Sequence, residues 1–288
     1  MKTESVKLSS PATKDFWEIP VLYEDEYLMA LDKPSRLLTS PDRYDPARPN
    51  LMKLLHAAVE GGKPWAKRRG LNYLMNAHRL DFETSGIILL AKTRPVLVLL
   101  ANQFGAEKPL KEYAALTHGF PIRPEFTINA KLAPHPVNLG MMRVDEKQGK
   151  KAVTEFSLVE RLGNYSLLNC RPLTGRTHQI RVHLRQAGLP ILGDELYGGA
   201  PLLLSRLKPG YRLKEKRTER PLLSRVALHA EKLSLAHPVT GEPVVISSPW
   251  ARDFQVAVKY LRRYCGAPGS APAAHGGDDE DDFAASPS

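Results

Sequence analysis

The chain has 288 residues, 42% of them hydrophobic and 25% charged, which is ordinary for a globular protein with a full hydrophobic core. No apolar run approaches the roughly 18 residues that a membrane span needs, and the N-terminus lacks the apolar core of a signal peptide. Two cysteines are too few for a disulfide framework or a four-cysteine metal site. We therefore expect a cytoplasmic protein without membrane association.

The basic excess is concentrated before residue 266. The formal net charge is +10, but residues 266–288 contain five acidic residues and no Lys or Arg, so residues 1–265 hold 41 basic and 26 acidic side chains, a formal charge of +15. Such an excess favours a polyanionic partner through counterion release. Nucleic acid is the leading candidate, with an anionic membrane surface second.

Composition divides the chain into three parts. Residues 1–16 mix Ser, Thr, Pro and Lys without periodicity and predict a flexible leader. Residues 17–265 contain the periodic segments and should form the folded domain. Residues 266–288 are rich in Gly, Ala, Pro and acidic side chains, a composition that predicts a disordered acidic tail.

The first ordered elements should be a hairpin and a helix. Two short apolar runs, 21–23 and 27–31, flank an acidic turn and predict paired strands. Asn50 is a suitable N-cap for a helix whose apolar residues recur at helical spacing, and Gly61 closes it.

The sequence HRLDFETSG at 78–86 is followed at once by the apolar run IILLA, which predicts a buried strand. An aspartate beside a histidine and an arginine, on a loop held by a buried strand, is typical of an active site. On local features alone, however, the stretch is more often a turn in which Asp81 and Ser85 bond their own backbone.

The rest of the domain is predicted to be mainly strands, after a helix over residues 96–104 that begins at Thr93 or Arg94, before a proline in the first turn. The runs at 111–116 and 126–132 are expected to lie near each other, and those at 141–144 and 153–159 flank a polar turn and predict a hairpin. Antiparallel strands with a few helices between them indicate an α+β fold. The remaining predicted elements are strands at 165–171, 228–235 and 244–247 and a helix at 253–264.

The sequence TGRTHQIRVHLRQAGLP at 174–190 predicts a helix over residues 178–187. Thr177 is a suitable N-cap, and Gly188 suits the position after the helix. Arg176 lies just before the helix N-terminus, whose amide groups also favour an anion. By itself this is also the pattern of a basic helix on the protein surface.

Together these stretches resemble the RluA family of pseudouridine synthases, and the resemblance extends over residues 19–255. The family usually has glycine where this chain has Arg36, a departure that bears on the conformation of that loop. Few residues precede the first predicted strand, so we expect no N-terminal S4-type RNA-binding domain such as many relatives carry. The family motifs occur in order as HRLD-x-x-TSG at 78–86, K-x-Y at Lys111 and Tyr113, TGRTHQIR-V-H at 174–183 and G-x-PI-x-GD-x-x-YG at 188–198.

The resemblance implies a pseudouridine synthase fold, with a mixed, mainly antiparallel sheet, flanking helices and a central RNA-binding cleft. It implies that the chain converts uridine to pseudouridine in structured RNA, ribosomal or transfer, by breaking the bond from C1′ to N1, turning the uracil and joining C1′ to C5. No cofactor, no metal and no obligatory protein partner is implied, and we expect a monomer.

The resemblance also assigns roles to residues. Asp81 would be the catalytic carboxylate, because breaking a glycosidic bond builds positive charge that a carboxylate can stabilise or capture. Tyr113 would stack on the uracil, and Arg181 would pair with Asp81 and hold it ionised. Arg79 would fill the gap left by the flipped uridine. The substrate and RNA contacts are expected to come from His78, Arg79, Thr84, Lys111, Arg176, His178 and Gln179.

Two other functions are compatible with these residues. One is a catalytically inactive RNA-binding protein of the same fold, against which the intact Asp81, Tyr113 and Arg181 argue. The other is a glycoside hydrolase that uses Asp81, which would need a second carboxylate such as Glu83.

Overall fold

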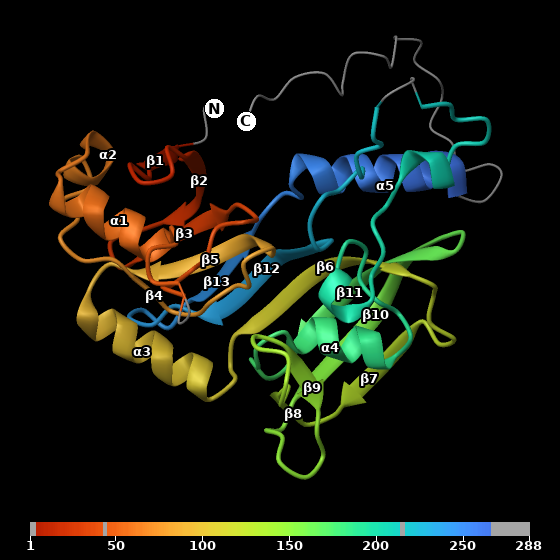
Figure 1. Ribbon diagram of the computed structural model, residues 1–288. Coiled ribbons are helices and arrows are strands. Elements are labelled where there is room, and N and C mark those ends of the chain that lie inside the picture. The colour runs from red at the N-terminus through yellow and green to blue at the C-terminus, as the bar shows by residue number, and fades with distance from the viewer. Residues whose placement is uncertain (1–3, 43–44, 214–216, 266–288) are drawn as a thin grey trace.

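The structure is a computed structural model that describes residues 4–42, 45–213 and 217–265 (Figure 1). Its strands are β1 (Ser5–Ser9), β2 (Phe16–Glu24), β3 (Leu28–Lys33), β4 (Met75–Asn76), β5 (Ser85–Ala91), β6 (Leu110–His118), β7 (Glu125–Asn129), β8 (Leu132–Pro134), β9 (Met142–Val144), β10 (Val153–Leu162), β11 (Tyr165–Pro172), β12 (Leu228–Ala236) and β13 (Pro243–Ser247). Its helices are α1 (Leu51–Glu60), α2 (Pro64–Lys67), α3 (Arg94–Gly105), α4 (Gln179–Gln186) and α5 (Arg252–Cys265), with short 3-10 helices at Glu195–Tyr197 and Leu204–Arg206.

In the described part of the chain the strands form one eleven-stranded sheet and a separate hairpin of β8 with β9. The order across the sheet is β1-β2-β3-β5-β12-β6-β11-β10-β7, with β4 added to β5 and β13 added to β12. Neighbouring strands pair antiparallel, except β12 and β5, which are parallel. The predicted fold class, α+β with a mixed, mainly antiparallel sheet and flanking helices, is confirmed.

In the first half of the sheet, β1 to β5, the strands β3 and β5 are buried on both faces because α1 and α3 pack on opposite sides of them. Successive residues of a strand point to opposite faces. Met29 and Leu31 of β3 therefore pack with α1, while Leu28 and Ala30 pack with α3. As predicted, Asn50 caps α1, and its side chain accepts a backbone N–H of the first turn.

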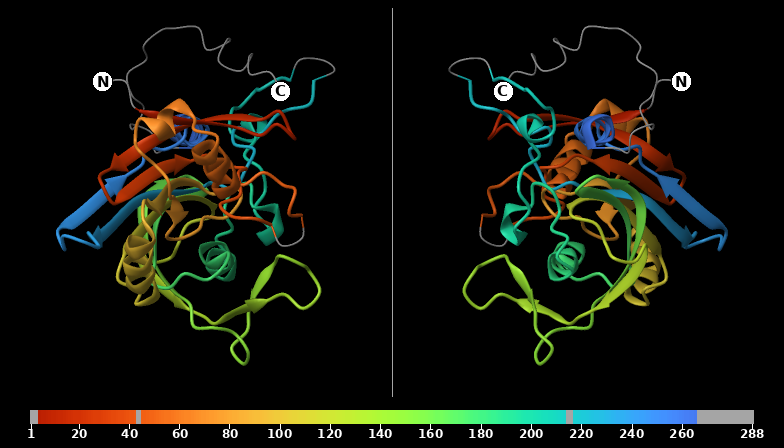
Figure 2. Two further views of the ribbon diagram at one scale, coloured as in Figure 1. Left: turned by 90° about the vertical axis from the view of Figure 1, so that its left-hand side faces the viewer. Right: turned by 90° about the vertical axis from the view of Figure 1, so that its right-hand side faces the viewer.

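The second half of the sheet consists of β6, β11, β10 and β7 and shares one hydrophobic core with α4 and α5. Ile180 and Leu184 of α4 and Phe254 and Leu261 of α5 pack with β6, β10 and β11. Figure 2 shows α4 end-on, between this half of the sheet and the β8–β9 hairpin. The helix is therefore held from two sides, which fixes the direction of its N-terminus.

The two halves meet where β12 lies between β5 and β6. Its pairing with β5 is limited to His229 with Ser85 and Ala230 with Gly86. Gly86 has a φ of +108°, and a Cβ there would lie 2.2 Å from the carbonyl oxygen of Ala230, so only glycine fits. The Ser85 hydroxyl is also hydrogen-bonded to Nδ1 of His229, at 2.9 Å. The end of the 78–86 stretch is thus the point at which the halves join.

Three predictions about strands were wrong. Residues 1–16 are not a flexible leader throughout, because Val6 and Leu8 are buried and Ser5–Ser9 pair with β2. The segments 141–144 and 153–159 do not pair with each other: β9 pairs with β8, while β10 pairs with β7 and β11. Strands β6 and β7 are separated by β10 and β11.

The predicted acidic tail, residues 266–288, lies outside the described residues. Among the helices that the structure describes, none has the length and apolar character required to cross a membrane.

We predict that Gly86→Ala destabilises the protein by about 3 kcal/mol, because the added methyl group meets backbone atoms of β12 at a left-handed φ. Urea denaturation at neutral pH measures this change. Gly105→Ala is the control, since a Cβ at Gly105 has no neighbour within 4 Å, and its stability should stay within about 1 kcal/mol of the wild type. Equal effects of the two substitutions would contradict the prediction.

The buried His229 should make the fold sensitive to acid. Burial lowers the pKa of His229 from 6.5 to about 4, so the unfolded chain binds a proton between these pH values while the folded chain does not. Stability is therefore lost as the pH falls through this window. We predict that the free energy of unfolding of the wild type falls between pH 7 and pH 5 by about 2 kcal/mol more than that of His229→Gln. Parallel urea denaturation curves at both pH values test this, and identical pH dependence would refute it.

Candidate active site

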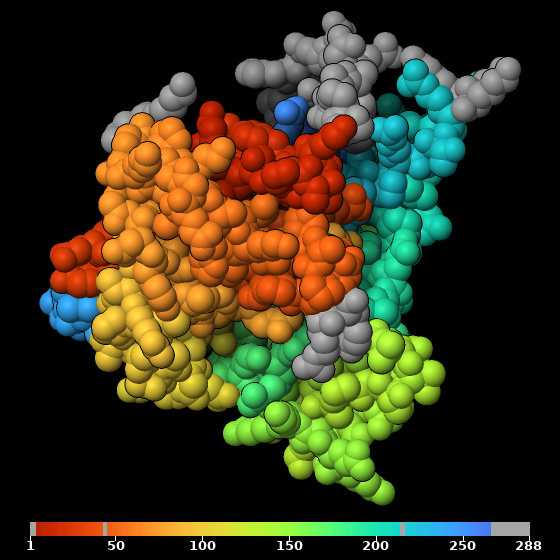
Figure 3. Space-filling view, turned by 60° about the vertical axis from the view of Figure 1, so that its left-hand side comes forward, coloured from red at the N-terminus to blue at the C-terminus, as the bar shows by residue number. Residues whose placement is uncertain are grey.

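A cleft of about 350 Å³ opens between the two halves of the sheet. In Figure 3 it lies between the orange and yellow surface of the first half and the green surface of the second. Its walls come from the 78–84 loop, the end of α3, β6 and the segment that leads into α4. All ten predicted site residues line it, namely His78, Arg79, Asp81, Thr84, Lys111, Tyr113, Arg176, His178, Gln179 and Arg181.

Asp81 lies on a loop whose backbone is fixed from both sides. The Thr39 hydroxyl donates to the carbonyl of Leu80 at 3.0 Å and accepts its N–H at 3.1 Å. The N–H of Arg36 donates to the carbonyl of Phe82 at 2.7 Å. The Asp81 carboxylate, 20% exposed, is therefore presented to the cleft by an anchored backbone.

Arg36 adopts the conformation that a glycine would favour. Its φ is +60°, in the left-handed region. Its side chain donates to the carbonyl of Ser224, so it bridges the loop before the 78–86 stretch and the segment before β12. Arg36 thus occupies a left-handed position of the kind that glycine adopts without strain.

Arg181 is the central cation of the site. Its Nε and Nη2 each donate to the carboxylate of Asp194 at 2.7 Å, and both side chains are almost fully buried. Its Nη1 lies 3.7 Å from Oδ2 of Asp81. Burial opposes the charge, but the hydrogen bonds and charge of Asp194 outweigh burial and raise the pKa of Arg181. The main partner of Arg181 is thus Asp194, and Asp81 is the longer, second contact.

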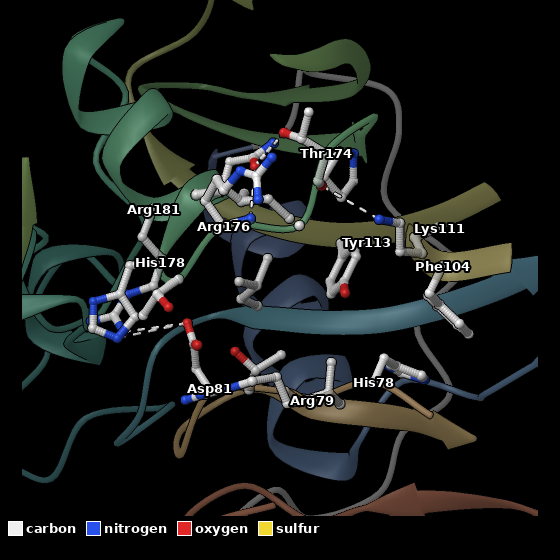
Figure 4. Close-up of a pocket in the computed structure, with 18 of the residues that line it drawn as sticks. His78, Arg79, Asp81, Phe104, Lys111, Tyr113, Thr174, Arg176, His178 and Arg181 are labelled. Atoms are coloured by element: carbon white, nitrogen blue, oxygen red, sulfur yellow. Dashed lines mark hydrogen bonds and ion pairs between the residues drawn. The ribbon is translucent and has the colours of Figure 1, made fainter. Parts of the chain in front are cut away.

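His178 precedes α4 in a left-handed conformation, with a φ of +53° and no side-chain cap bond. The helix therefore begins at Gln179, and the prediction that Thr177 caps it was wrong. The sharp turn directs the imidazole towards Asp81, with Nε2 3.9 Å from Oδ2 (Figure 4). Such backbone strain is common at functional sites. Burial lowers the pKa of His178.

Tyr113, on β6, lies in the middle of the cleft, between Asp81 on one side and His78 on the other (Figure 4). Burial, and then the charge of Asp81, raise the pKa of its phenol, which therefore keeps its proton at neutral pH. Lys111 lies on the same strand, and its Nζ donates to the carbonyl of Thr174 at 3.4 Å. Burial lowers the pKa of Lys111.

His78 forms part of the wall of the cleft. Its ring stacks on Phe104 with centroids 5.1 Å apart, and its Nε2 accepts the N–H of Leu89 at 3.1 Å. Burial lowers its pKa to about 4, so the ring is neutral. These contacts hold His78 against α3 and β5.

The side chain of Gln179 is fully engaged within the protein. Its Oε1 accepts from the Thr174 hydroxyl and the Arg176 N–H, and its Nε2 donates to the Val153 carbonyl and the Thr154 hydroxyl. These four bonds use the whole hydrogen-bonding capacity of the amide. Gln179 therefore shapes the segment that leads into α4.

The remaining predicted contacts differ in exposure. Arg79 is exposed beside Asp81, whereas Thr84 is buried. Arg176 is partly exposed, with Nη2 3.8 Å from Glu107 and Nε bonded to the carbonyl of Lys151. Arg79 and Arg176 are thus the predicted side chains most open to a ligand.

Sequence reasoning missed three residues of the site. Asp194 holds Arg181, and Tyr197 contacts His178. Both lie in the family motif at 188–198, to whose residues the resemblance assigned no role in the site. Lys33 is buried behind the Asp81 loop and donates to the carbonyls of Pro34 and Leu37. Burial lowers its pKa to about 7, opposed by the charge of Asp81. In the sequence, a lysine before a proline indicates only the end of a strand, so Lys33 was not predicted to belong to the site.

Among the described residues, Glu107 is the only carboxylate besides Asp81 that lines the cleft, and Glu83 does not line it. Glu107 is exposed, and its Oε1 lies 3.8 Å from Nη2 of Arg176. The described residues also contain no group of three or more His, Cys, Asp or Glu that could hold a metal ion. The arrangement does not favour a glycoside hydrolase, which needs two positioned carboxyl groups.

Comparison with known proteins agrees with this geometry. The family model described as RNA pseudouridylate synthase matches residues 27–186. The chain is 33% identical to the dual-specificity RNA pseudouridine synthase RluA of Salmonella typhi over 230 residues, covering 80% of this chain and 92% of the relative. It is also 33% identical over 269 residues to the ribosomal large subunit pseudouridine synthase D of Zymomonas mobilis, covering 90% and 78%.

A solved structure supports the fold. Human RNA pseudouridylate synthase domain containing 4 superposes with a TM-score of 0.62 and 22% identity, covering 84% of this chain and 92% of that one. The chain therefore belongs to the RNA pseudouridylate synthase family, in the RluA group that its motifs resemble. It is an isomerase that converts uridine to pseudouridine in RNA.

We predict that Asp194→Asn destabilises the protein by about 3 kcal/mol, because it leaves the buried guanidinium of Arg181 without its main counter-charge. Urea denaturation at pH 7 measures the loss. Glu195→Gln removes an exposed charge from the adjacent position and should change stability by less than about 0.5 kcal/mol. An Asp194→Asn protein as stable as the control would show that Asp194 is not required to offset the charge.

Proposed function

We propose that Asp81 is the carboxylate that carries out the isomerisation. The observation that carries this proposal is the convergence of Asp81, Arg181 and Tyr113, from three distant segments, on one cleft. Breaking the bond from C1′ to N1 leaves positive charge on the ribose, and a carboxylate at that point can stabilise or capture it. Attack on C1′, attack on the uracil ring and removal of a ribose proton all remain compatible with the position of Asp81.

Arg181 and Tyr113 support this chemistry in different ways. Arg181 holds Asp81 by charge while remaining paired with Asp194, so it does not depend on Asp81 for neutralisation. Tyr113 offers a flat ring on which a uracil can stack, and its hydroxyl keeps its proton at neutral pH. We also assign to its hydroxyl a part in moving the proton that leaves C5.

Entry of a uridine into this cleft requires that the base leave the RNA stack. The exposed Arg79, adjacent to the Asp81 loop, is our candidate for the side chain that fills the gap. Lys111 and Arg176 add positive charge along the same cleft and would contact the RNA backbone. Thr84 and His178 complete the proposed substrate contacts, while His78 and Gln179 act through the shape of the cleft walls.

The RNA substrate is proposed to be ribosomal or transfer RNA. One relative is named for the large ribosomal subunit, which supports ribosomal RNA, and another is named for dual specificity. Transfer RNA is proposed from the resemblance to the RluA family. We further propose that the protein acts as a monomer, in the cytoplasm and without an obligatory protein partner. A catalytically inactive RNA-binding protein is disfavoured because Asp81, Tyr113 and Arg181 are all present in the cleft.

We predict that Asp81→Asn lowers the single-turnover rate of pseudouridine formation by roughly a thousandfold or more, while RNA affinity stays within about threefold. The assay uses total RNA from cells that lack the gene, with chemical mapping of pseudouridine and without added metal. Glu83→Gln, which alters a neighbouring carboxylate that does not line the cleft, is the control and should remain active. Full activity of Asp81→Asn would overturn the proposal.

A further inference from the structure

Tyr197 links the β8–β9 hairpin to the site. Its ring is 1% exposed and packs in a small cluster with Leu132 and Val182. Its hydroxyl oxygen accepts the N–H of Met142 at 2.9 Å and lies 2.8 Å from Nδ1 of His178. The hydroxyl thus contacts both a backbone amide of the hairpin and the imidazole that faces the cleft.

The bonding of this hydroxyl fixes the position of the His178 proton. A buried hydroxyl hydrogen requires an acceptor. The Met142 amide is a donor, so among the described residues Nδ1 of His178 is the acceptor that the hydroxyl contacts. Nδ1 therefore carries no hydrogen, and the neutral imidazole carries its hydrogen on Nε2. That nitrogen is directed at Asp81.

The two donors near Asp81 approach the same oxygen of its carboxylate. Nε2 of His178 lies 3.9 Å from Oδ2, and Nη1 of Arg181 lies 3.7 Å from the same Oδ2. Each donor thus makes its closest approach to the carboxylate at Oδ2. The Asp81 side chain is 20% exposed and lines the cleft, so the carboxylate also faces the space that a substrate would occupy. Both distances exceed a hydrogen bond, as is common in catalytic sites before the substrate closes them.

We propose that Tyr197 and His178 are positioning residues for the isomerisation: Tyr197 holds His178 as the Nε2–H tautomer, which donates to Oδ2 of Asp81 and leaves Oδ1 to face the uridine. This inference rests on the proposed function of Asp81 and deepens it. It also assigns to Met142 the role of fixing the Tyr197 hydroxyl through its backbone N–H.

The charge state of His178 matters as much as its tautomer. Asp81, Arg181, Asp194 and Arg79 all act on it electrostatically, and burial is the largest influence and lowers its pKa. A neutral donor orients the carboxylate without adding a second full positive charge beside Arg181. A second cation would stabilise the ionised carboxylate further and weaken it as a base or nucleophile.

Imidazole ¹⁵N NMR on the full-length protein without RNA tests the tautomer directly. The His178 signals are assigned by their loss in His178→Gln. In the wild type we expect hydrogen on Nε2, and in Tyr197→Phe we expect the Nδ1–H form to become populated, because the donor to Nδ1 is gone. Hydrogen on Nδ1 in the wild type would overturn the inference.

Single-turnover kinetics on the mapped RNA measure the consequence. Tyr197→Phe should react roughly ten- to a hundredfold more slowly, with RNA affinity unchanged within about twofold, since one hydrogen-bond contribution is lost from the chemical step. Tyr23→Phe is the matched control, because it removes a 2.6 Å bond from a tyrosine hydroxyl to Asp25, outside the cleft, and it should retain the wild-type rate. His178→Gln keeps a donor near Asp81 and should retain more activity than His178→Met.

The outcomes separate this inference from the proposed function. A wild-type rate in Tyr197→Phe, together with loss of activity in Asp81→Asn, would reject the positioning role and keep the catalytic aspartate. An active Asp81→Asn would reject the catalytic aspartate itself, and the positioning role with it. Equal activity of His178→Gln and His178→Met would also overturn the role assigned to the Nε2 donor.

Discussion

The geometry of the cleft depends on the buried ion pair between Arg181 and Asp194. Burial of an unpaired guanidinium would be costly, and the bidentate bond to Asp194 offsets that cost. Because the charge of Arg181 is already balanced, its third nitrogen can face Asp81 without making the fold depend on the charge of Asp81. The charge of Arg181 is thus balanced whether Asp81 is ionised, bonded or protonated. That independence suits the role proposed for Asp81.

Local patterns predicted those parts of the fold that local forces decide. Asn50 was predicted to cap α1, and its side-chain oxygen accepts an amide of the first turn. Of the two residues at which α3 was predicted to begin, Thr93 is the N-cap and accepts in the same way. The insertion of β12 between β5 and β6 could not be predicted, because such pairing is decided by packing between segments more than a hundred residues apart. The short strand β1 was missed because the alternation of Val6 and Leu8 is too brief to stand out among polar neighbours.

The same division applies to the site. The motifs predicted that Asp81, Tyr113 and Arg181 would belong together, and the cleft contains all three. They did not predict which carboxylate Arg181 holds most closely. Asp194 lies in a glycine-rich turn, where an aspartate more often bonds its own backbone, and its reach to α4 depends on the path of the chain over the second half of the sheet. Sequence patterns thus indicate the members of the site, and packing decides their partners.

The place of β12 in the sheet has a consequence for synthesis of the protein. Asp81 precedes β5 in the first half, while Tyr113 and Arg181 belong to the second, and the strand between the halves is Leu228–Ala236. A growing chain folds from its N-terminus, so both halves can acquire structure on the ribosome before the strand that joins them has emerged. The two walls of the cleft are therefore joined through the sheet only after residues 228–236 have been synthesised.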